Sequence, residues 1–307
     1  MSTSRIAHFS DTHVLSLEGV GPGQFLNKRL TGAVNLALNR SKHYLVEVFE
    51  RLLDAVVAVE PDHAICTGDL VNLALEPEFR RVEELFAARF APEALTVVPG
   101  NHDYYVKDAV QQSRFERFFA PWMSYDLGGL DAAPYPVARL LPGVAIIGLN
   151  TAITTPVFMA GGAVAADQLQ RMRQMFAGPE VDGRFRLLML HHPLLPEPAR
   201  RFDAMRRLGN ADEVINAIRQ CGDHAPQLVV HGHNHVYKEM QVPGTEIPII
   251  QVASASRSGV GKYAAEFNVY VIEDGHLLDI ERHVHERSTG RFIPCDRHGQ
   301  PLAQRAS

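Results

Sequence analysis

The chain alternates short apolar runs with amphipathic stretches. Apolar runs that end at a Gly, a Pro or a polar turn are typical of buried strands. Six of them lie at 6–10, 63–67, 95–99, 144–149, 187–190 and 228–230. Apolar residues recur at helical spacing over 44–59 and 76–90, with shorter candidate helices at 167–176 and 212–218. Strands separated by helices predict a layered α/β domain whose central strands are covered on both faces.

The C-terminal third has a different pattern. Apolar runs at 247–253, 267–272 and 277–283 follow one another without intervening helices, and 273–276 predicts a hairpin turn. We therefore expect a second, partly antiparallel sheet. The polar residues from 286 onward are interrupted by Gly and Pro, and they predict a loosely packed C-terminal tail at 286–307. Residues 1–285 are expected to form a single domain.

The segment 15–40 fits neither pattern. A Gly-Pro-Gly turn precedes a basic amphipathic stretch whose apolar residues include Phe25, Leu26 and Leu30. Its place after the first strand predicts a cap-like insertion at about 14–43, over any site at that strand's end. The apolar stripe has two interpretations, local packing or lipid contact. Its basic residues Lys28, Arg29 and Arg40 either contact an anionic substrate or form a solvated helix face.

Composition narrows the function classes. The 307 residues carry a formal net charge of −5, so no general attraction for nucleic acid or anionic lipid is expected. No apolar run approaches ~18 residues, the length of a spanning helix, and the first residues resemble no signal peptide. Three widely spaced cysteines match no zinc-finger or disulfide pattern. We expect a cytoplasmic protein with reduced thiols.

Polar motifs follow five of the predicted strands. They are Asp-Thr-His at 11–13, Gly-Asp at 68–69, Gly-Asn-His-Asp at 100–103, His-His-Pro at 191–193 and Gly-His-Asn-His at 232–235. In open α/β sheets, ligands collect outside the carboxyl ends of strands, so these loops are expected to converge. Residues i and i+2 of an extended backbone point to one side, which would let both residues of each Asp-x-His or His-x-His pair reach one site. Imidazole and carboxylate groups without thiolates suit Mn, Fe, Co or Zn.

The five motifs, in this order, resemble those of the calcineurin-like metallophosphoesterases, over Asp11 to His235. The resemblance implies a four-layer α/β/β/α sandwich of mixed sheets with flanking helices, and two divalent transition metal ions (Mn, Fe or Zn). It implies one ion held by Asp11, His13, Asp69 and His235, and a second held by Asp69, Asn101, His191 and His233, with Asp69 bridging. His192 is the alternative to His191. His102 would face the phosphate as a catalytic residue, and Asp103 would orient it.

The resemblance further implies hydrolysis of phosphodiester bonds. The motifs are most similar to those of the bacterial cyclic-nucleotide and glycerophosphodiester phosphodiesterases, so a small phosphodiester is the expected substrate. No Ser or Cys nucleophile motif accompanies the ligands. A metal-bound hydroxide is therefore the expected nucleophile, because paired cations ~3.5–4 Å apart can acidify a water molecule.

Two alternatives stay open. The basic, apolar segment 15–40 also suits a pyrophosphohydrolase of a lipid-linked nucleotide sugar, similar to the UDP-diacylglucosamine hydrolases, with peripheral membrane contact. An apolar cleft lined by Phe25, Leu26 and Leu30 would favour this pyrophosphohydrolase. A non-catalytic scaffold of this fold would lack ligands, whereas all seven are present here. The aromatic stretch 104–131 would be a pocket wall, a homodimer surface or ordinary helix packing.

Overall fold

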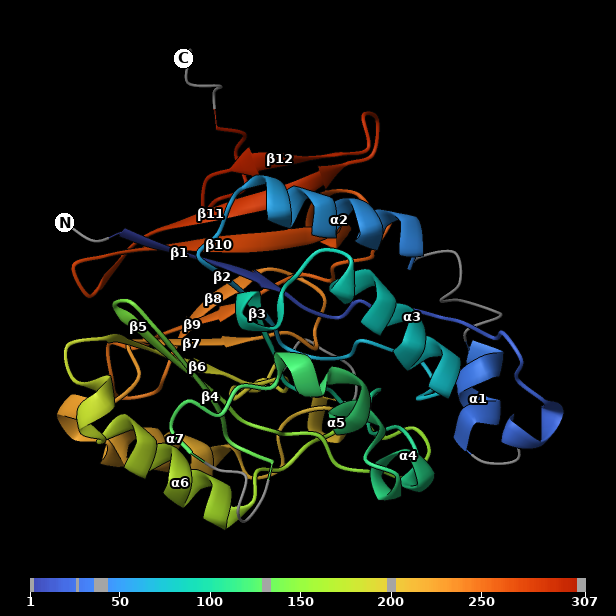
Figure 1. The fold of residues 1–307 in the computed structure, drawn as a ribbon, viewed down its shortest axis with the longest axis horizontal. Coiled ribbons are helices and arrows are strands. Elements are labelled where there is room, and N and C mark those ends of the chain that lie inside the picture. The colour runs from blue at the N-terminus through green and yellow to red at the C-terminus, as the bar shows by residue number, and fades with distance from the viewer. Residues whose placement is uncertain (1–2, 26–27, 36–43, 129–133, 198–202, 303–307) are drawn as a thin grey trace.

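Two six-stranded sheets lie face to face, with helices on their outer sides (Figure 1). The computed structural model describes residues 3–25, 28–35, 44–128, 134–197 and 203–302. This arrangement confirms the predicted four-layer α/β/β/α sandwich with mixed sheets.

The first sheet combines a parallel and an antiparallel half. Its order is β12 (Arg291–Cys295), β11 (His276–Glu286), β10 (Glu266–Glu273), β1 (Thr3–Phe9), β2 (His63–Cys66) and β3 (Leu95–Val97). Strands β1, β2 and β3 are parallel, whereas β10 pairs antiparallel with both β1 and β11. The carboxyl ends of β1, β2 and β3 therefore share one edge.

The second sheet has a parallel centre. Its order is β4 (Val137–Leu141), β5 (Val144–Gly148), β6 (Phe185–Met189), β7 (Leu228–His231), β9 (Pro248–Gln251) and β8 (Lys238–Gln241). Strands β5, β6, β7 and β9 are parallel, and β4 and β8 are antiparallel edge strands.

Helices cover both outer faces. Figure 1 shows α2 (Val46–Ala58) and α3 (Glu76–Ala87) beside the first sheet, and α6 (Ala166–Phe176) and α7 (Ala211–Gln220) beside the second. The remaining α-helices are α1 (Lys28–Asn35), α4 (Lys107–Gln111) and α5 (Arg114–Phe119). Short 3-10 helices lie at Pro22–Phe25, Pro92–Ala94, Ala120–Trp122, Pro179–Val181, Asp203–Met205, Gly222–His224 and Gly261–Tyr263. None of the helices in the described ranges is long and apolar enough to cross a bilayer.

The apolar runs are buried on both faces of each central strand. In β5, Val144 and Ile146 belong to the larger core cluster, which fills the space between the sheets and under α2 and α3. Their neighbours Ala145 and Ile147 belong to the second cluster, under α6 and α7. This alternation follows from the two-residue period of a strand, and it explains why the central strands are continuously apolar.

The C-terminal third folds differently from the prediction. The strands after 247 do not form a sheet of their own, because β9 joins β7 while β10 pairs with β1, with Ile6 opposite Tyr270. The prediction of a loosely packed tail is wrong for Arg291–Cys295, since β12 pairs with β11 and the Phe292 ring packs 5.8 Å from that of Phe267. The hairpin turn between β10 and β11 is confirmed.

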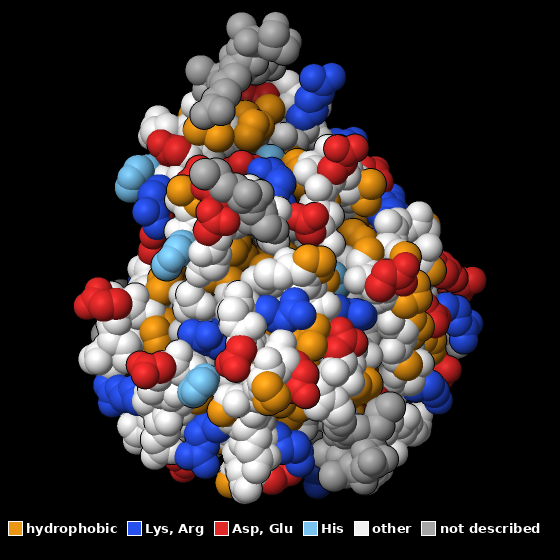
Figure 2. Space-filling view, turned by 60° about the vertical axis from the view of Figure 1, so that its left-hand side comes forward, with side chains coloured by type: hydrophobic (Ala, Val, Ile, Leu, Met, Phe, Trp, Pro, Cys, Tyr) orange, Lys and Arg blue, Asp and Glu red, His pale blue; other side chains and the backbone are white. Residues whose placement is uncertain are grey.

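Charges of both signs are mixed on the face drawn in Figure 2. Lys and Arg side chains alternate with Asp and Glu, and apolar side chains are scattered between them. This face therefore offers no continuous basic surface of the kind that tracks a nucleic-acid backbone.

Candidate metal centre

All seven predicted ligands lie where a strand meets its loop, at the edge shared by both sheets. Asp11 and His13 follow β1, Asp69 follows β2 and Asn101 follows β3, while His191 follows β6, and His233 and His235 follow β7. All of these side chains are buried. The parallel strands of both sheets end at this edge, and that topology brings residues far apart in the sequence together.

The first cluster contains Asp11, His13, Asp69 and His235, whose potential ligand atoms all lie within 4.8 Å of one another. Nε2 of His235 is 3.0 Å from Oδ1 of Asp11 and 3.1 Å from Nε2 of His13. Nε2 of His13 is in turn 3.8 Å from Oδ2 of Asp69. Two carboxylates and two imidazoles thus point at a common centre.

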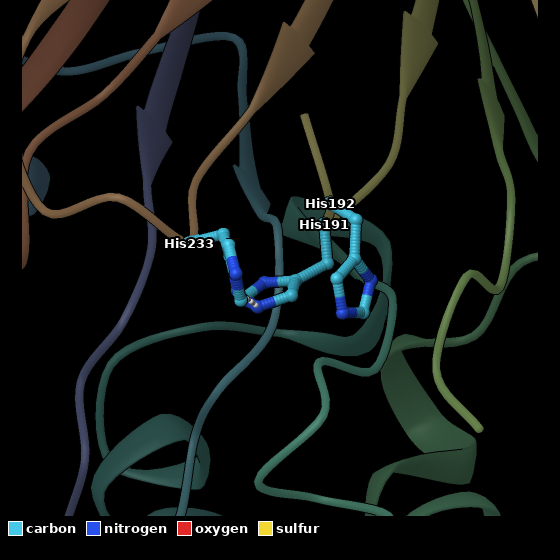
Figure 3. A group of neighbouring side chains, drawn as sticks. All are labelled: His191, His192 and His233. Atoms are coloured by element: carbon cyan, nitrogen blue, oxygen red, sulfur yellow. Dashed lines mark hydrogen bonds between the residues drawn. The ribbon is translucent and has the colours of Figure 1, made fainter. Parts of the chain in front are cut away.

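The second cluster is built around His191. Its Nε2 lies 3.4 Å from Oδ2 of Asp69 and 3.2 Å from Nδ1 of His233. Figure 3 shows the His191 and His233 rings turned toward each other from the ends of neighbouring strands. Asp69 therefore contacts both clusters through one carboxylate oxygen. The buried Oδ1 of Asn101 has no hydrogen-bond partner among the described residues.

These groups fit divalent cations. Atoms that share a cation at ~2.0–2.2 Å in tetrahedral or octahedral geometry lie about 2.8–3.6 Å apart, which covers most of the separations above. Paired imidazole nitrogens and buried carboxylates are costly without a positive charge between them. Nitrogen and oxygen donors without thiolate are the set preferred by Mn, Fe, Co or Zn.

The geometry favours His191 over His192 as a ligand. His192 lies close enough to be grouped with His191 and His233, but both of its ring nitrogens are engaged elsewhere. Its Nδ1 is 2.7 Å from Thr151 Oγ1, and its Nε2 is 3.2 Å from the carbonyl oxygen of Ala160. His191 instead donates from Nδ1 to the carbonyl of Thr67 at 2.6 Å, which directs Nε2 toward Asp69.

The backbone at the clusters is left-handed, not extended as the sequence argument assumed. Positive φ angles occur at five candidate ligands, namely Asp11 (56°), His13 (46°), Asp69 (54°), His233 (73°) and His235 (59°). Each such residue costs about 1–2 kcal/mol relative to an ordinary conformation. The paired residues of each motif converge because the chain turns sharply, and the assumed alternation of an extended strand is wrong here.

Glycines next to the ligands permit this close approach. A Cβ at Gly232 would overlap the Asp11 carboxylate, and one at Gly100 would overlap that of Asp69. The glycines of the Gly-Asn-His-Asp and Gly-His-Asn-His motifs are therefore required by the space left for carboxylates that belong to other loops.

His102 lies beside the first cluster. Its backbone N–H donates to Oδ1 of Asp69 at 2.7 Å, and its Nδ1 donates to the carbonyl of Asn72 at 2.6 Å. Its ring contacts His13 edge to face at 4.8 Å and stacks on Tyr105 at 5.3 Å with a 12° interplanar angle. These contacts hold the His102 ring in one orientation next to the candidate metal site.

Asp103 does not orient His102 as expected. Its Oδ1 accepts backbone N–H groups of Leu70 and Val71 at 2.9 and 3.1 Å, and its Oδ2 accepts that of Gly100 at 2.8 Å. Burial, aided by the nearby Asp69 charge, raises the pKa of Asp103 to about 8. Asp103 thus ties the loop after β2 to the loop after β3, and Asn72 supplies the contact that orients His102.

The charges of the centre are strongly coupled. Burial alone would raise the pKa of Asp69, but the neighbouring histidines, above all His191, hold it well below its usual range. Burial alone would lower the pKa of His191, but the Asp69 carboxylate raises it to about 9. The protein thus concentrates a negative charge that stabilises positive charge beside it.

Sequence motifs did not identify several residues that hold the centre in place. The Tyr44 hydroxyl lies 2.7 Å from Nδ1 of His235, and Tyr105 packs on His102. The amide of Asn72 donates to the carbonyl of His13. Tyr44 and Tyr105 lie outside any ligand motif, and the only signal for Asn72 was its position three residues after Asp69.

The basic residues of the 15–40 segment serve as links between segments. Arg29 is buried and donates to the carbonyls of Leu73 and Ala74 at 2.8 and 2.9 Å. Lys28 donates from Nζ to Thr155 Oγ1 at 2.9 Å and to the carbonyl of Met159 at 3.2 Å. The prediction for Arg40 falls outside the described residues.

The apolar residues of the 15–40 segment differ in their burial. Phe25 packs against Leu73 and Leu75, as the local-packing interpretation predicts, whereas Leu30 is 55% exposed. Leu26 falls outside the described residues. In the aromatic stretch after the Gly-Asn-His-Asp motif, Phe115, Phe118, Phe119 and Trp122 are core residues, which supports ordinary helix packing.

Comparisons with known proteins agree with this geometry. The family model of the calcineurin-like phosphoesterases matches residues 4–237. No curated protein matches the sequence.

Solved structures share the fold at low sequence identity. A purple acid phosphatase from yellow lupin (Lupinus luteus) superposes with a TM-score of 0.53 and 12% identity, covering 100% of this chain and 57% of its own. A putative 5'-nucleotidase from Staphylococcus aureus superposes with a TM-score of 0.50 and 11% identity, covering 99% of this chain and 55% of its own. The chain thus spans little more than half the length of either protein, and at these identities the likeness concerns the fold alone.

Proposed function

Since the chain belongs to the calcineurin-like phosphoesterase family, we propose that it is a dinuclear metal-dependent hydrolase of phosphodiester bonds. The observation that carries this proposal is the position of Asp69. Its Oδ2 lies 3.8 Å from the His13 imidazole of one cluster and 3.4 Å from the His191 imidazole of the other. A shared carboxylate is the ligand that two neighbouring cations require.

In this proposal the ligands divide as the clusters do. Asp11, His13, Asp69 and His235 hold one cation, and Asp69, Asn101, His191 and His233 hold the second. When bound, the two cations would supply positive charge for the phosphoryl oxygens and would lower the pKa of a bound water molecule. All seven side chains converge at the sheet edge, which supports catalysis over a scaffold without metals.

His102 is the proposed catalytic residue of the chain itself. Its Nδ1–H is committed to the Asn72 carbonyl, and stacking on Tyr105 fixes the ring plane. Nε2 is then the atom that can donate a proton or hydrogen bond to the leaving oxygen. The ring lies edge to face with that of His13 at 4.8 Å, which supports a role for His102 at a phosphate held beside the first cluster.

An activity panel with Mn-loaded protein tests the proposal. It compares bis-p-nitrophenyl phosphate, p-nitrophenyl phosphate, cyclic nucleotides and a lipid-linked UDP-sugar. We expect the diester to be hydrolysed faster than the monoester, and Asp69→Asn to abolish activity on both. A strong preference for the monoester would overturn the diesterase proposal.

One observation favours a second candidate, a pyrophosphohydrolase of a lipid-linked nucleotide sugar. Leu30 of α1 is 55% exposed, and Lys28 on the same helix contacts the loop that follows β5. An apolar substituent of a substrate would find contact there. Preferential hydrolysis of the lipid-linked UDP-sugar over the aryl diester would select this candidate.

A further inference from the structure

The loop that follows β5 presents an unusual exposed surface. From 151 to 166 the sequence contains no charged residue. Within seven of these residues, four large apolar side chains are exposed: Ile153, Val157, Phe158 and Met159. Single exposed apolar residues need no explanation, but a cluster of this kind marks a site of contact. We call residues 153–159 the apolar tip.

Phe158 is placed at a cost to folding. The backbone N–H of Met159 donates to the carbonyl of Pro156 at 3.2 Å, which closes a four-residue turn with Phe158 in its third position. Phe158 has a φ of 69° and is 82% exposed. That turn position favours Gly, because an L side chain in the left-handed region is strained. A residue with a strained backbone and a solvated ring contributes little to folding, which indicates a role for Phe158 in binding.

The apolar tip is attached to the edge of the candidate metal centre. Both ends of the loop are held by His192, whose Nδ1 is 2.7 Å from Thr151 Oγ1 and whose Nε2 is 3.2 Å from the carbonyl of Ala160. The adjacent residue, His191, belongs to the second cluster. The base of the apolar tip is therefore hydrogen-bonded to the residue that directly follows a candidate ligand of the second cluster.

Basic residues flank the apolar tip. The ammonium group of Lys28 donates to Thr155 Oγ1 and to the carbonyls of Thr155 and Met159, within the tip. The carbonyl of Arg207 accepts from the N–H of Gly162, three residues after the tip, and Arg207 is exposed. The acid of that segment, Asp203, is turned to the backbone N–H of Glu197 at 3.1 Å. Figure 1 shows α1, which carries Lys28, on the opposite side of the molecule from the two termini.

We propose that the apolar tip docks into the surface of a membrane that contains anionic lipid, with the exposed Arg207 at the level of the headgroups and the half-buried positive charge of Lys28 beside the tip. Exposed aromatic and aliphatic side chains bordered by Lys and Arg are the chemistry that binds such an interface. This inference rests on the proposed function in one respect: the purpose of the docking is to bring phosphoesters at the membrane surface to the metal centre. A second copy of the chain is a poorer occupant, because a two-fold interface would place the same cations opposite one another.

Vesicle sedimentation of the full chain tests this docking. The probes are vesicles of phosphatidylcholine alone and of phosphatidylcholine with about a quarter phosphatidylglycerol, an anionic lipid that attracts basic side chains. We expect binding to the anionic vesicles, reduced about tenfold or more in Phe158→Gly, since a buried aromatic side chain is lost. Glycine suits the positive φ of that position, so this variant keeps the turn. Arg207→Gln should weaken binding to the anionic vesicles only.

A matched control is Leu278→Ser on β11, whose side chain is 64% exposed away from this loop. It should bind as the unmodified chain does. Absence of binding to anionic vesicles, or equal binding by Phe158→Gly, would overturn the proposal. A change from dimer to monomer in Phe158→Gly without vesicle binding would also overturn it, in favour of a second copy. Sedimentation needs no substrate, so its failure is distinct from failure of the diesterase proposal.

Discussion

The hydroxyl of Tyr44 lies 2.7 Å from Nδ1 of His235, and Nε2 of the same ring faces Asp11 and His13 at 3.0 and 3.1 Å. One imidazole thus connects a tyrosine near the start of α2 with the first candidate cluster. A hydrogen bond to the distal nitrogen fixes the tautomer and orientation of a ligating histidine. If Nε2 binds a cation, the ring proton is on Nδ1, and this N–H donates a hydrogen bond to the Tyr44 oxygen.

Replacing Tyr44 should therefore weaken metal binding without removing a ligand. We expect Tyr44→Phe to lower the affinity of the first site about 10- to 100-fold, the usual effect of losing such an outer contact. Competition with a chromogenic chelator measures the affinity. Tyr125→Phe is the control, because Tyr125 bridges Ala138 of the edge strand β4 and belongs to neither cluster. Unchanged affinity in Tyr44→Phe would show that the contact does not position His235.

Variants of the two adjacent histidines, His191 and His192, should differ in the amount of metal they bind. We expect His191→Ala to lose roughly one equivalent of metal, because it removes a donor of the second cluster. His192→Ala should retain its metal and lose about 1–3 kcal/mol of unfolding free energy, since the Thr151 hydroxyl and the Ala160 carbonyl lose a partner. Elemental analysis and chemical denaturation measure both effects. Loss of metal in His192→Ala alone would reverse the assignment.

Substitution of Asp103 should mainly lower stability, whereas substitution of His102 should mainly lower activity. Asp103→Ala leaves three buried backbone N–H groups without their acceptor, so we expect a loss of about 3 kcal/mol or more in the free energy of unfolding. His102→Ala should lose less stability than Asp103→Ala, keep its metal content and lower kcat by roughly 10²- to 10⁴-fold, as removal of a general acid does. His276→Ala, at an exposed hairpin position, is the control for histidine loss. An Asp103→Ala protein as stable as the parent but equally slow as His102→Ala would restore the orienting role.

Acid should destabilise the protein partly through His63. This buried residue contacts Thr96 Oγ1 at 2.8 Å, and burial lowers its pKa to about 3. A lowered pKa means that the unfolded chain binds the proton first, so stability is present above pH ~6.5 and is lost as pH falls toward 3. At pH 5 the loss from this group is about 2 kcal/mol.

His63→Gln should accordingly flatten the pH dependence of unfolding between pH ~7 and ~5. Urea denaturation at several pH values measures this dependence. The protein is kept metal-free, so that metal binding does not contribute to its stability. His224→Gln, at an exposed position, is the matched control. The prediction fails if His63→Gln and His224→Gln have the same pH slope.

Much of the fold and of the candidate site could be predicted because local patterns encode them. The central strands are buried on both faces, so β5 and β7 stand out as apolar runs. Two edge strands, β8 and β12, were missed for a physical reason. Strand β8 (Lys238–Gln241) is largely exposed and polar, and β12 (Arg291–Cys295) contains a proline, so neither shows a strand pattern.

The contacts that support the ligands could not be predicted, because they depend on how distant loops meet. The contact of Tyr44 with His235 joins positions 191 residues apart. The direction of the Asp103 side chain is set by the backbone of the loop after β2, which no motif within 100–103 describes. Residue types and spacing thus identify donors, whereas the tertiary structure decides which donors point inward.

Each candidate cluster takes side chains from both sheets, which has a consequence for the loaded protein. Asp11 and Asp69 follow strands of the first sheet, whereas His191 and His235 follow strands of the second. An ion bound there bridges the two halves of the sandwich, and the unfolded chain cannot reproduce the site. By mass action, each hundredfold excess of free metal over its dissociation constant then adds about 2.7 kcal/mol to stability. The melting temperature of the protein therefore depends on the concentration of free metal. In a cell with little free metal, a larger fraction of the protein would be unfolded.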